Sequence, residues 1–467
     1  PDYSTSQVDY QHFDPPRDLA PLLPGDQVDH GCLSKLTTYR QLRQLAGRGY
    51  DIFINLCEGY LDWEIPSIDV IESLERLSLP YTGPTALLYD PSKPLMKYVA
   101  HTAGVRTPAH AVVSDPARLD EAVAGLRFPL FVKPPHAGDS LGVAPDSRVQ
   151  DPAELAGVVG RTIANFGEAL VEEYIDGREF TVLVLAPVEP GAAPTALAPV
   201  EYRFPPGPPF KTYAHKTSAL HPGANVPVDD ARLAARLREA AVAIIRAFGG
   251  VGYARLDFRQ GGAGELYFLE VNFTCSVFYQ GDYQGSADHI LALDGLGQAG
   301  FARHIIAEGM ARHGRRQLPY RMGGDATSGY GIFATRALAA GEVVYPGEGR
   351  AQRIVTARHA ATWSDADRLT FRRYAYPLSG EVYVLWDQDP TRWAPQNHSC
   401  SANTRFDGLD LVALRPVAVG EELTLDYGTV LNEASEPFDC RCGSPACRGR
   451  IAGVAGNSVT EREQRLR

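Results

Sequence analysis

The stretch that decides the fold is Gly252–Asn272, GYARLDFRQGGAGELYFLEVN. It predicts two strands, Tyr253–Phe258 and Leu266–Asn272, joined by a glycine-rich turn at residues 261–264. Side chains alternate between the two faces of a strand. One face of the hairpin is therefore expected to be apolar and to face a core, and it comprises Leu256, Phe258, Leu269 and Val271.

The other face of this hairpin carries the polar residues. Arg255 and Asp257 share that face on the first strand, and Glu270 and Asn272 share it on the second. Two carboxylates that lie close together repel each other unless a cation lies between them. Ligands that are all oxygen favour Mg²⁺, and Mg²⁺ held in this way usually carries substrate phosphates. The hairpin thus predicts a magnesium site, and the alternative is an exposed hairpin with solvated acids.

The composition indicates a multidomain protein. The chain has 467 residues, of which 44% are hydrophobic, too many for a single core. A net charge of −11 argues against a nucleic-acid partner, and no apolar run is long enough to span a membrane. The chain opens at Pro1 without a signal-like segment, so we expect a cytoplasmic protein whose sequence is trimmed and lacks a first strand.

Lysines and cysteines are few, which makes each one informative. Only six of the 45 basic residues are lysines: Lys35, Lys93, Lys97, Lys133, Lys211 and Lys216. The compact ammonium group and the planar guanidinium group are not interchangeable at a phosphate. Three of the seven cysteines fall between Cys440 and Cys447, which favours metal thiolates over disulfides in a reducing compartment.

The elements before the hairpin predict an α/β fold. Residues 50–56 have the pattern of a buried strand, and residues 65–79 that of a helix. Asp90-Pro91 and Asp151-Pro152 are expected to cap helices, because aspartate accepts from free backbone N–H groups and proline fits the first turn. Further expected elements are a strand at 128–133 with a glycine-containing loop at 135–143, strands at 169–175 and 178–185, a long loop at 205–224, and a helix at 230–248.

In this order the elements resemble the ATP-grasp superfamily, most closely its D-alanine–D-alanine ligase branch, over roughly residues 50–310. The resemblance implies that a carboxylate is phosphorylated by ATP and that an amine then displaces phosphate, which forms an amide. It implies Mg²⁺ ligands at Asp257, Glu270 and Asn272, and a catalytic Arg255 that steadies the tetrahedral centre. The ATP-binding residues it implies are Lys93, Lys133, Ser140, Glu172, Glu173, Tyr174, Ile175, Glu179 and Lys211.

The chain departs from this branch where the second substrate would bind. The family follows its metal strand with Asn-Thr-x-Pro-Gly, whereas this chain has Asn272-Phe-Thr-Cys-Ser276. The turn that presents backbone N–H groups to the acyl oxygen is therefore altered. We expect ATP and metal binding to be retained and the acceptor pocket to differ. D-alanine, the substrate of the family, is therefore not expected to be the substrate of this chain.

A second set of motifs begins after a polar linker near Arg312. These are Gly329-Tyr-Gly331, Asn397-His-Ser-Cys400, Asp426-Tyr427-Gly428 and Cys440-Arg-Cys442 with Cys447, on short predicted strands. Each alone could be an ordinary turn or strand end. In this order they resemble the SET methyltransferase domain with its cysteine-rich post-SET tail. The resemblance implies S-adenosylmethionine binding by Gly329, Tyr330, Gly331, Asn397, His398 and Tyr427, with Tyr427 also catalytic beside the methyl-transfer channel.

Four cysteines are candidate ligands of a structural zinc ion. Thiolates at Cys440, Cys442 and Cys447, with a fourth at Cys400, satisfy the closed four-sulfur coordination typical of structural zinc. The alternative is a disulfide pair. Cys32, Cys57 and Cys275 are left as core or loop residues, although Cys275 could face the acyl site.

The expected fold class is an α/β (α+β) ATP-grasp fold followed by a mainly β SET domain with a small zinc-bound tail. The expected boundaries are 1–90 for an N-terminal α/β domain, 91–175 and 176–312 for the two ATP-grasp subdomains, 320–435 for the SET domain, 436–452 for the post-SET zinc motif, and 453–467 for a polar tail.

The expected function is ATP-dependent amide formation fused to N-methylation by S-adenosylmethionine, with amino acids or peptides as substrates. One alternative is a protein-lysine methyltransferase whose ATP-grasp part is a binding or regulatory platform. Another is a ligase whose SET part only recognises substrate. The sequence leaves open the acid, the amine, the methyl acceptor and the oligomeric state, with a homodimer among the possibilities.

Overall fold

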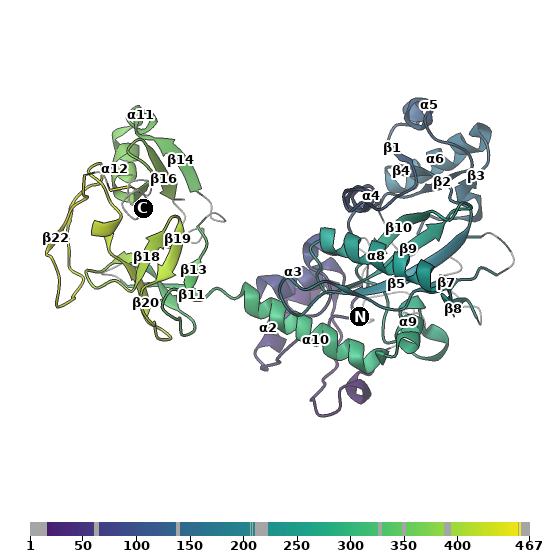
Figure 1. The fold of residues 1–467 in the computed structure, drawn as a ribbon, viewed down its shortest axis with the longest axis horizontal. Coiled ribbons are helices and arrows are strands. Elements are labelled where there is room, and N and C mark those ends of the chain that lie inside the picture. The colour runs from purple at the N-terminus through teal and green to yellow at the C-terminus, as the bar shows by residue number, and fades with distance from the viewer. Residues whose placement is uncertain are drawn as a thin grey trace. The chain divides into compact units, whose positions relative to one another are not determined.

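The computed structural model describes residues 16–59, 65–136, 141–205, 207, 209–210, 223–325, 329–347, 352–386, 394–455 and 457–458. The chain divides into two units, Pro1–Arg315 and Arg316–Arg467. Figure 1 labels their helices and strands. The first unit, unit 1, contains both predicted strands of the hairpin, and the second, unit 2, contains the cysteine-rich segment.

The larger sheet of unit 1 has the strand order β10-β9-β5-β7-β8, with β6 paired to β5. All its pairings are antiparallel. Its strands are β5 (Arg178–Leu185), β6 (Thr195–Ala196), β7 (Val200–Tyr202), β8 (Asn225–Pro227), β9 (Tyr253–Gln260) and β10 (Leu266–Asn272). The predicted hairpin is thus β9–β10, and it forms one edge of this sheet.

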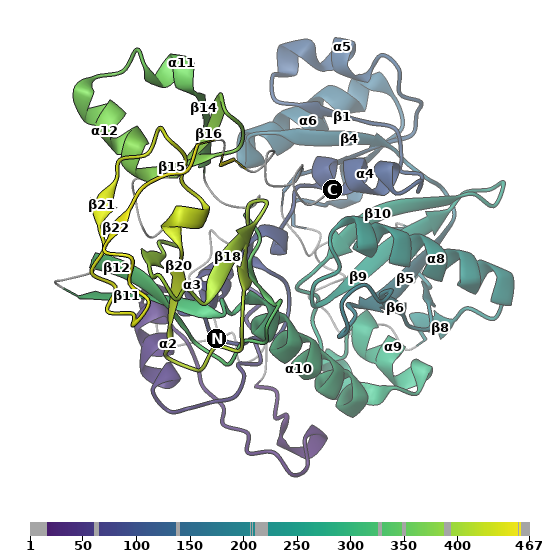
Figure 2. The same cartoon turned by 60° about the vertical axis from the view of Figure 1, so that its left-hand side comes forward.

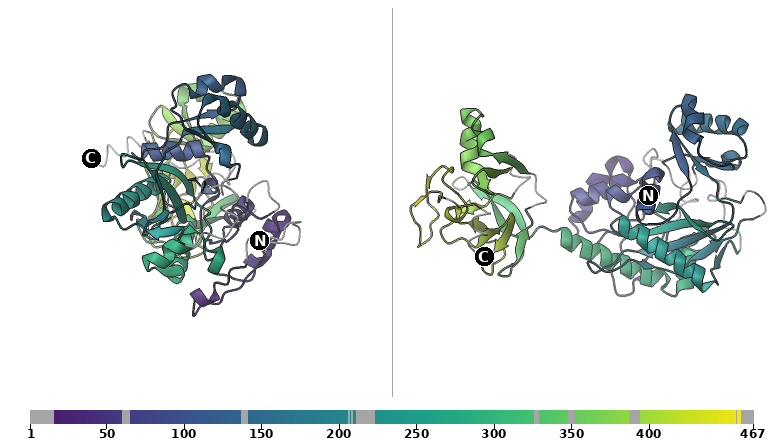
Figure 3. Two further views of the ribbon diagram at one scale, coloured as in Figure 1. Left: turned by 90° about the vertical axis from the view of Figure 1, so that its right-hand side faces the viewer. Right: turned by 45° about the horizontal axis from the view of Figure 1, so that its top comes forward.

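Helices cover both faces of the larger sheet. On one face α4 (Lys93–Thr102) and α8 (Ala231–Ala247) pack against strands β5, β9 and β10. Figure 2 shows α8 lying across this sheet. On the other face α9 (Ser286–Asp294) and α10 (Gly297–Arg316) form a second apolar layer. Both views of Figure 3 show helices flanking the sheets of unit 1.

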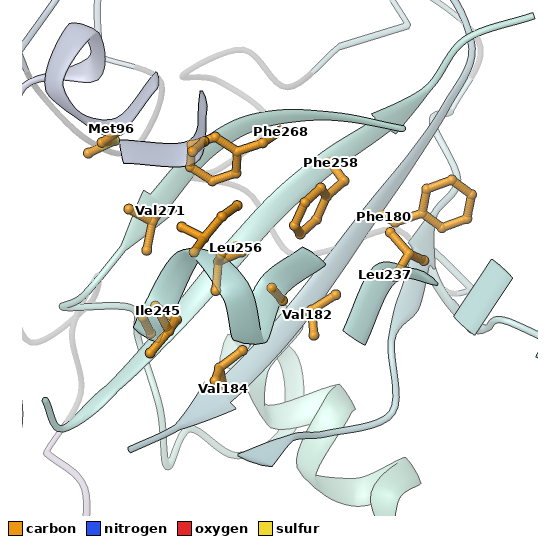
Figure 4. Packing of buried hydrophobic residues seen from close by; sticks show 14 of the residues in the cluster. Met96, Phe180, Val182, Val184, Leu237, Ile245, Leu256, Phe258, Phe268 and Val271 are labelled. Carbon is orange, nitrogen blue, oxygen red and sulfur yellow. The ribbon is translucent and has the colours of Figure 1, made fainter. Parts of the chain in front are cut away.

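The core beneath α8 is built from aromatic and branched side chains. Phe180, Phe258 and Phe268 are fully buried, and Met96 from α4 belongs to the same cluster, at the end where Phe268 lies (Figure 4). Burying one such side chain contributes about 1.5–3 kcal/mol. The rigid layer that results holds the opposite, polar face of β9 and β10 in position.

The smaller sheet of unit 1 has the order β1-β4-β2-β3 and is also antiparallel. It consists of β1 (His110–Val113), β2 (Leu130–Lys133), β3 (Arg148–Val149) and β4 (Ala169–Glu173), with α5 (Leu119–Val123) and α6 (Pro152–Phe166) packed on it. The side chain of Asp151 accepts from the backbone N–H groups of Ala153 and Glu154, so the predicted cap of α6 is confirmed.

Four details of unit 1 correct the sequence-based expectations. The register of β10 with β9 shifts between Phe268 and Glu270, so the side chain of Phe268, and not that of Leu269, lies in the core. Helix α4 is capped by Ser92, whose side chain accepts from Leu95 N, and not by Asp90. Residues 50–56 form only a bridge, Phe53 to Tyr81, before α3 (Ile68–Arg76). Finally, α10 continues to Arg316, through much of the predicted linker.

Unit 2 is mainly β structure. Its largest sheet has the order β11-β12-β20-β18-β19-β13, with β17 paired to β20. These strands are β11 (Tyr320–Asp325), β12 (Gly329–Ala334), β13 (Val343–Tyr345), β17 (Asn397–His398), β18 (Thr404–Asp407), β19 (Asp410–Ala413) and β20 (Glu422–Leu425).

Two smaller elements complete unit 2. A three-stranded sheet of β14 (Gln352–Thr356), β16 (Val382–Trp386) and β15 (Ala375–Pro377) packs with α11 (Ala357–Ala360) and α12 (Asp365–Tyr374). A ribbon of β21 (Phe438–Asp439) and β22 (Arg450–Ile451) brackets the last three cysteines. The described helices of the chain include none that is long and apolar enough to cross a membrane.

Candidate active sites

A cavity in unit 1 is lined by residues of both sheets. Its walls include side chains of β2 and β4 from the smaller sheet and of β9 and β10 from the larger one. Of the residues implied to bind ATP or magnesium, the cavity is lined by Lys93, Lys133, Glu172, Glu173, Tyr174, Ile175, Glu179, Asp257 and Glu270. Residues far apart in the sequence therefore meet at one place.

The two predicted metal carboxylates face each other across the hairpin. Asp257 and Glu270 are direct cross-strand partners in the β9–β10 register. Asp257 is 4% exposed, and its carboxylate accepts from the hydroxyl of Thr181 at 2.8 Å and from Arg255 at 3.4 Å. The ammonium group of Lys93 lies 4.0 Å from Glu270. These cations offset part of the repulsion between the acids, and the paired oxygens suit a hard divalent cation.

Asn272 lies in a different environment from the two acids. It pairs with Arg255 in the register of the hairpin, as its position predicts. Its side-chain oxygen accepts from the backbone N–H of Thr274 at 3.0 Å, and Asn272 is not among the residues that line the cavity. In this state the amide therefore closes the turn after β10.

A buried ionic group fixes one wall of the cavity. The carboxylate of Glu172 forms ion pairs with the ammonium groups of Lys97 and Lys133, each at 2.7 Å, and all three side chains are at most 8% exposed. Burial alone would raise the pKa of Glu172, but the two ammonium groups lower it to about 2. Burial lowers the pKa of Lys97, whereas for Lys133 the charges of Glu172 and Glu270 outweigh burial and raise its pKa.

Arg259 forms the opposite end of the cavity. Its guanidinium group donates to Glu179 at 3.1 Å and to the carbonyl of Ile175 at 2.9 Å, and it also contacts the carbonyl of Pro209. It stacks over Tyr174 at 4.8 Å. Phe131 and Phe210 complete an aromatic wall of the kind that accommodates a flat base.

The sequence carried a signal for two of the functional residues that we missed. Lys97 lies one helical turn after Lys93, so both face the same side of α4. Arg259 continues the alternation of Arg255 and Asp257 along β9. The contribution of Phe210 followed from no local pattern.

Three more of the predicted ATP-binding residues are Glu173, Ser140 and Lys211. The carboxylate of Glu173 is bound by the exposed side chain of Arg127, at 2.9 and 3.0 Å. Ser140 and Lys211 lie outside the described residues.

The predicted S-adenosylmethionine residues of unit 2 lie around β20: β12, with Gly329–Gly331, and β17, with Asn397 and His398, both pair with β20, and Tyr427 follows it. Asn397 donates from Nδ2 to Glu422 at 2.8 Å. A Cβ atom at Gly331 would lie 2.5 Å from that carboxylate and 2.8 Å from Nδ2 of Asn397, so a side chain there would displace this hydrogen-bonded pair. Gly329 has a positive φ of 73°, and Tyr330 is 63% exposed.

Tyr427 is partly buried in unit 2 and is bonded to the residue that precedes β17. Its hydroxyl donates to the carbonyl of Gln396 at 2.6 Å. Burial raises the pKa of Tyr427 to about 12, so the phenol stays protonated at neutral pH. The phenol is therefore a hydrogen-bond donor to Gln396.

His398 connects Tyr427 to the cysteines. The backbone N–H of Tyr427 donates to Nδ1 of His398 at 3.1 Å, and Nε2 lies 3.4 Å from the sulfur of Cys400. A backbone N–H can only donate, so Nδ1 accepts, and Nε2 of the neutral ring carries the proton. Burial lowers the pKa of His398, which favours this neutral form.

The predicted cysteines converge in space. One side-chain donor atom from each of His398, Cys400, Cys440 and Cys442 lies within 4.8 Å of the others. The sulfur of Cys447 is 3.6 Å from that of Cys440. Backbone N–H groups of Cys400 and Ser444 lower the pKa of the Cys442 thiol to about 6. In this tautomer the imidazole donates to the sulfur of Cys400, and His398 lies among the side chains that are close enough together to hold a metal ion.

Comparison with protein families identifies both units. Residues 100–277 match the model of the D-Ala-D-Ala ligase C-terminus, and residues 329–428 match the SET domain. The D-alanine–D-alanine ligase of Bordetella petrii is 34% identical over 50% of this chain and 70% of its own length. An uncharacterised protein, y4sG of Sinorhizobium fredii, is 33% identical over 52% of this chain and 71% of its own length.

Solved structures resemble the chain more distantly. The ATP complex of D-alanine–D-alanine ligase from Bacillus anthracis is 20% identical, with a TM-score of 0.45 over 60% of this chain and 85% of its own.

The buried ionic group makes a prediction about stability. Changing Glu172 to Gln leaves two buried ammonium groups without an anion, so the free energy of unfolding should fall by about 3–5 kcal/mol at neutral pH. Because the folded-state pKa of Glu172 is depressed to about 2 from 4.5, its contribution is present above pH 4.5 and is lost as the pH falls towards 2. Urea denaturation across this range should show the two proteins converging.

The neighbouring Glu173→Gln variant is the control. Glu173 pairs with the exposed Arg127, so its loss should cost no more than about 1 kcal/mol. Equal effects of the two substitutions would contradict a special role for the buried group.

Proposed function

Because the chain belongs to the D-alanine–D-alanine ligase family through its ATP-grasp unit and carries a SET domain, we propose that it is an ATP-dependent carboxylate–amine ligase fused to an N-methyltransferase. The observation that supports the ligase most directly is the cavity in which Lys93, Lys133 and the Asp257–Glu270 pair meet. Amino acids or peptides are the proposed substrates.

The proposed ligation has two steps. A carboxylate oxygen of the acid attacks the γ-phosphorus of ATP, ADP leaves, and an acyl phosphate forms. A neutral amine then attacks the acyl carbon, phosphate leaves, and the nitrogen loses a proton. Lys93 and Lys133 would bind phosphate oxygens, and Arg255 would stabilise the negative oxygen of the tetrahedral centre. Mg²⁺, held by Asp257 and Glu270 with Asn272 as a third candidate ligand, would supply charge neutralisation.

The proposed methyl transfer also requires a neutral amine. The amine first loses its proton. Its nitrogen then attacks the methyl carbon of S-adenosylmethionine, the carbon–sulfur bond breaks, and S-adenosylhomocysteine leaves. Alkyl amines have a pKa near 10.4, so a site must remove or disfavour that proton. The loop and strand at Gly329–Gly331, with Asn397 and His398, would bind the cofactor, and Tyr427 would position the amine. We propose a small molecule or peptide related to the ligase product as the acceptor.

We further propose a structural zinc ion in unit 2, held by Cys400, Cys440, Cys442 and Cys447. These thiols fit four-sulfur coordination, and the tautomer of His398 makes it a donor to Cys400. The ion would join the segment that follows β17 to the ribbon of β21 and β22. Such a site contributes directly to folding.

The ligase proposal predicts the effect of Asp257→Asn. The substitution preserves size but removes a hard anionic ligand, so ADP release that depends on an acid and an amine should fall by about a hundredfold or more. Products formed from pooled amino acids and ATP are identified by mass spectrometry. Asp151→Asn, a helix cap that asparagine can replace, is the control and should retain full activity. Persistent nucleotide binding without any turnover in the wild type would instead favour the binding platform.

The zinc proposal predicts one zinc ion per chain in protein purified without chelator. Cys447→Ser should lose zinc, whereas Cys32→Ser, an exposed thiol in unit 1, should retain it. Chelation should unfold unit 2 before unit 1. With cobalt in place of zinc, His398→Gln should leave a sulfur-only absorption spectrum. If the wild-type spectrum instead shows a nitrogen ligand that is lost in His398→Gln, then His398 binds the metal and Cys447 does not.

The methyltransferase proposal predicts that Tyr427→Phe slows methyl transfer by about tenfold, because one positioning hydrogen bond is lost. ADP formation should not change. Tyr376→Phe removes a similar bond, from a buried tyrosine hydroxyl to the carbonyl of Gly408, and serves as the control. Radiolabelled S-adenosylmethionine gives the readout. Label found on protein lysines alone, and never in the low-mass fraction with ligase substrates present, would contradict a small acceptor.

A further inference from the structure

A second ionic group, Arg17 with Glu58, lies in unit 1 and has no role in the ligation steps proposed above. Arg17 donates to Glu58 at 2.5 Å, and the hydroxyl of Ser276 donates to the other oxygen of the same carboxylate at 2.5 Å. Ser276 belongs to the altered turn that follows β10. Three segments distant in the sequence therefore converge on one carboxylate.

The two partners of this ion pair differ in accessibility. The side chain of Arg17 is 4% exposed, and that of Glu58 is 22% exposed. Arg17 also donates to the carbonyls of Leu56 and Val277, at 2.8 and 3.2 Å, and stacks over Tyr279 at 4.4 Å. The arginine thus fixes the backbone on both sides of the group, and the carboxylate is the part that solvent reaches.

The segment that carries Glu58 is itself held firmly. The hydroxyl of Tyr89 donates to the carbonyl of Gly59 at 2.5 Å, and the N–H of Gly59 donates to Pro66 at 3.2 Å. A Cβ atom at Gly59 would lie 2.7 Å from two backbone carbonyl oxygens. The position of the carboxylate is therefore fixed by packing, as a recognition site requires.

Glu58 lies at the turn that follows the hairpin strand β10. The hydroxyl of Ser276 donates to its carboxylate, and Asn272, four residues earlier, ends β10 and pairs with Arg255 in the register of the hairpin. Cys275, next to Ser276, is buried. The carboxylate is therefore tied to the segment that continues directly from the strand pair carrying Arg255.

From this arrangement we infer that Glu58, held by Arg17 and Ser276, binds the ammonium group of a ligase substrate. A positive guanidinium at Arg255 and an accessible negative carboxylate at Glu58 match a substrate with a carboxyl or acyl group near a cation. The same carboxylate would repel a substrate carboxylate placed at Ser276. This inference rests on the proposed ligase and adds the charge of its substrate.

The bound ammonium is not the attacking amine. An amine must be neutral to attack an acyl phosphate, whereas a carboxylate stabilises the protonated form of a neighbouring amine. The ammonium is therefore either that of the acid substrate, next to its reacting carboxyl group, or a second ammonium of the acceptor. Both sources present the same chemistry to Glu58, and kinetics separate them.

The test is Glu58→Gln, which keeps the shape of the side chain and removes its charge. With the acid and amine identified by mass spectrometry, we expect the KM of one substrate to rise about tenfold to a hundredfold, with the KM of ATP unchanged. A rise for the acid, absent with its N-acetyl derivative, assigns the ammonium to the acid. A rise for the amine alone assigns it to the acceptor. Unchanged KM values for both, with reduced thermal stability, would overturn the inference and leave a structural ion pair.

Two further proteins complete the experiment. Ser276→Ala removes one hydrogen bond to the carboxylate and should raise the same KM by a smaller factor. This variant is the substitute test if Glu58→Gln does not fold. Glu121→Gln breaks an exposed arginine–glutamate pair on α5 and should change neither KM. If the wild type releases no ADP with any pair, the ligase proposal fails by itself. Titration of wild type and Glu58→Gln with D-alanine and with 1,4-diaminobutane then tests Glu58 alone, and equal affinities would refute its role.

Discussion

The repulsion between Asp257 and Glu270 is the constraint on which unit 1 depends. The register of β9 and β10 makes the two acids direct neighbours, and like charges in such positions destabilise a sheet. The structure balances this cost locally, with Arg255 and Thr181 bonded to Asp257 and Lys93 near Glu270. The apolar opposite face, packed under α8, keeps the strands from separating. The proposed site for phosphates and a divalent cation is thus supported by core packing on one side and by paired charges on the other.

Sequence pattern predicted the parts of unit 1 whose cause is local. Alternation along β9 and β10 placed the polar and apolar faces correctly, because a strand has a period of two. It misplaced Leu269, since a register shift adds a residue that no local pattern encodes. The cap of α4 was also misassigned. Asp90, Ser92 and two prolines offer competing starts for that helix, and tertiary contacts decide among them.

The ion pairs and hydrogen bonds between residues far apart in the chain could not be predicted from the sequence. Lys97, Glu172 and Lys133 come from three separate elements, and only the folded sheet brings their charges within 2.7 Å. The same holds for Arg17, Glu58 and Ser276, which span 260 positions of the chain. In unit 2 the spacing of the cysteines was informative, because metal ligands recur at short intervals. The hydrogen bonds that connect Tyr427 through His398 to Cys400 required coordinates.

Amine protonation links the two proposed activities of the chain. Both the acyl phosphate and the methyl sulfonium react only with a neutral nitrogen, and an alkyl amine is largely protonated at neutral pH. A carboxylate such as Glu58 retains an ammonium in its charged form, so it protects one amine while another reacts. If the protected ammonium belongs to the acid, the amide product still carries it after ligation. That product then presents the second unit with the one functional group that its chemistry requires, a primary amine that must be deprotonated. The amide nitrogen itself is too weak a nucleophile to accept the methyl group, so methylation of a ligated product would take place at that retained amine.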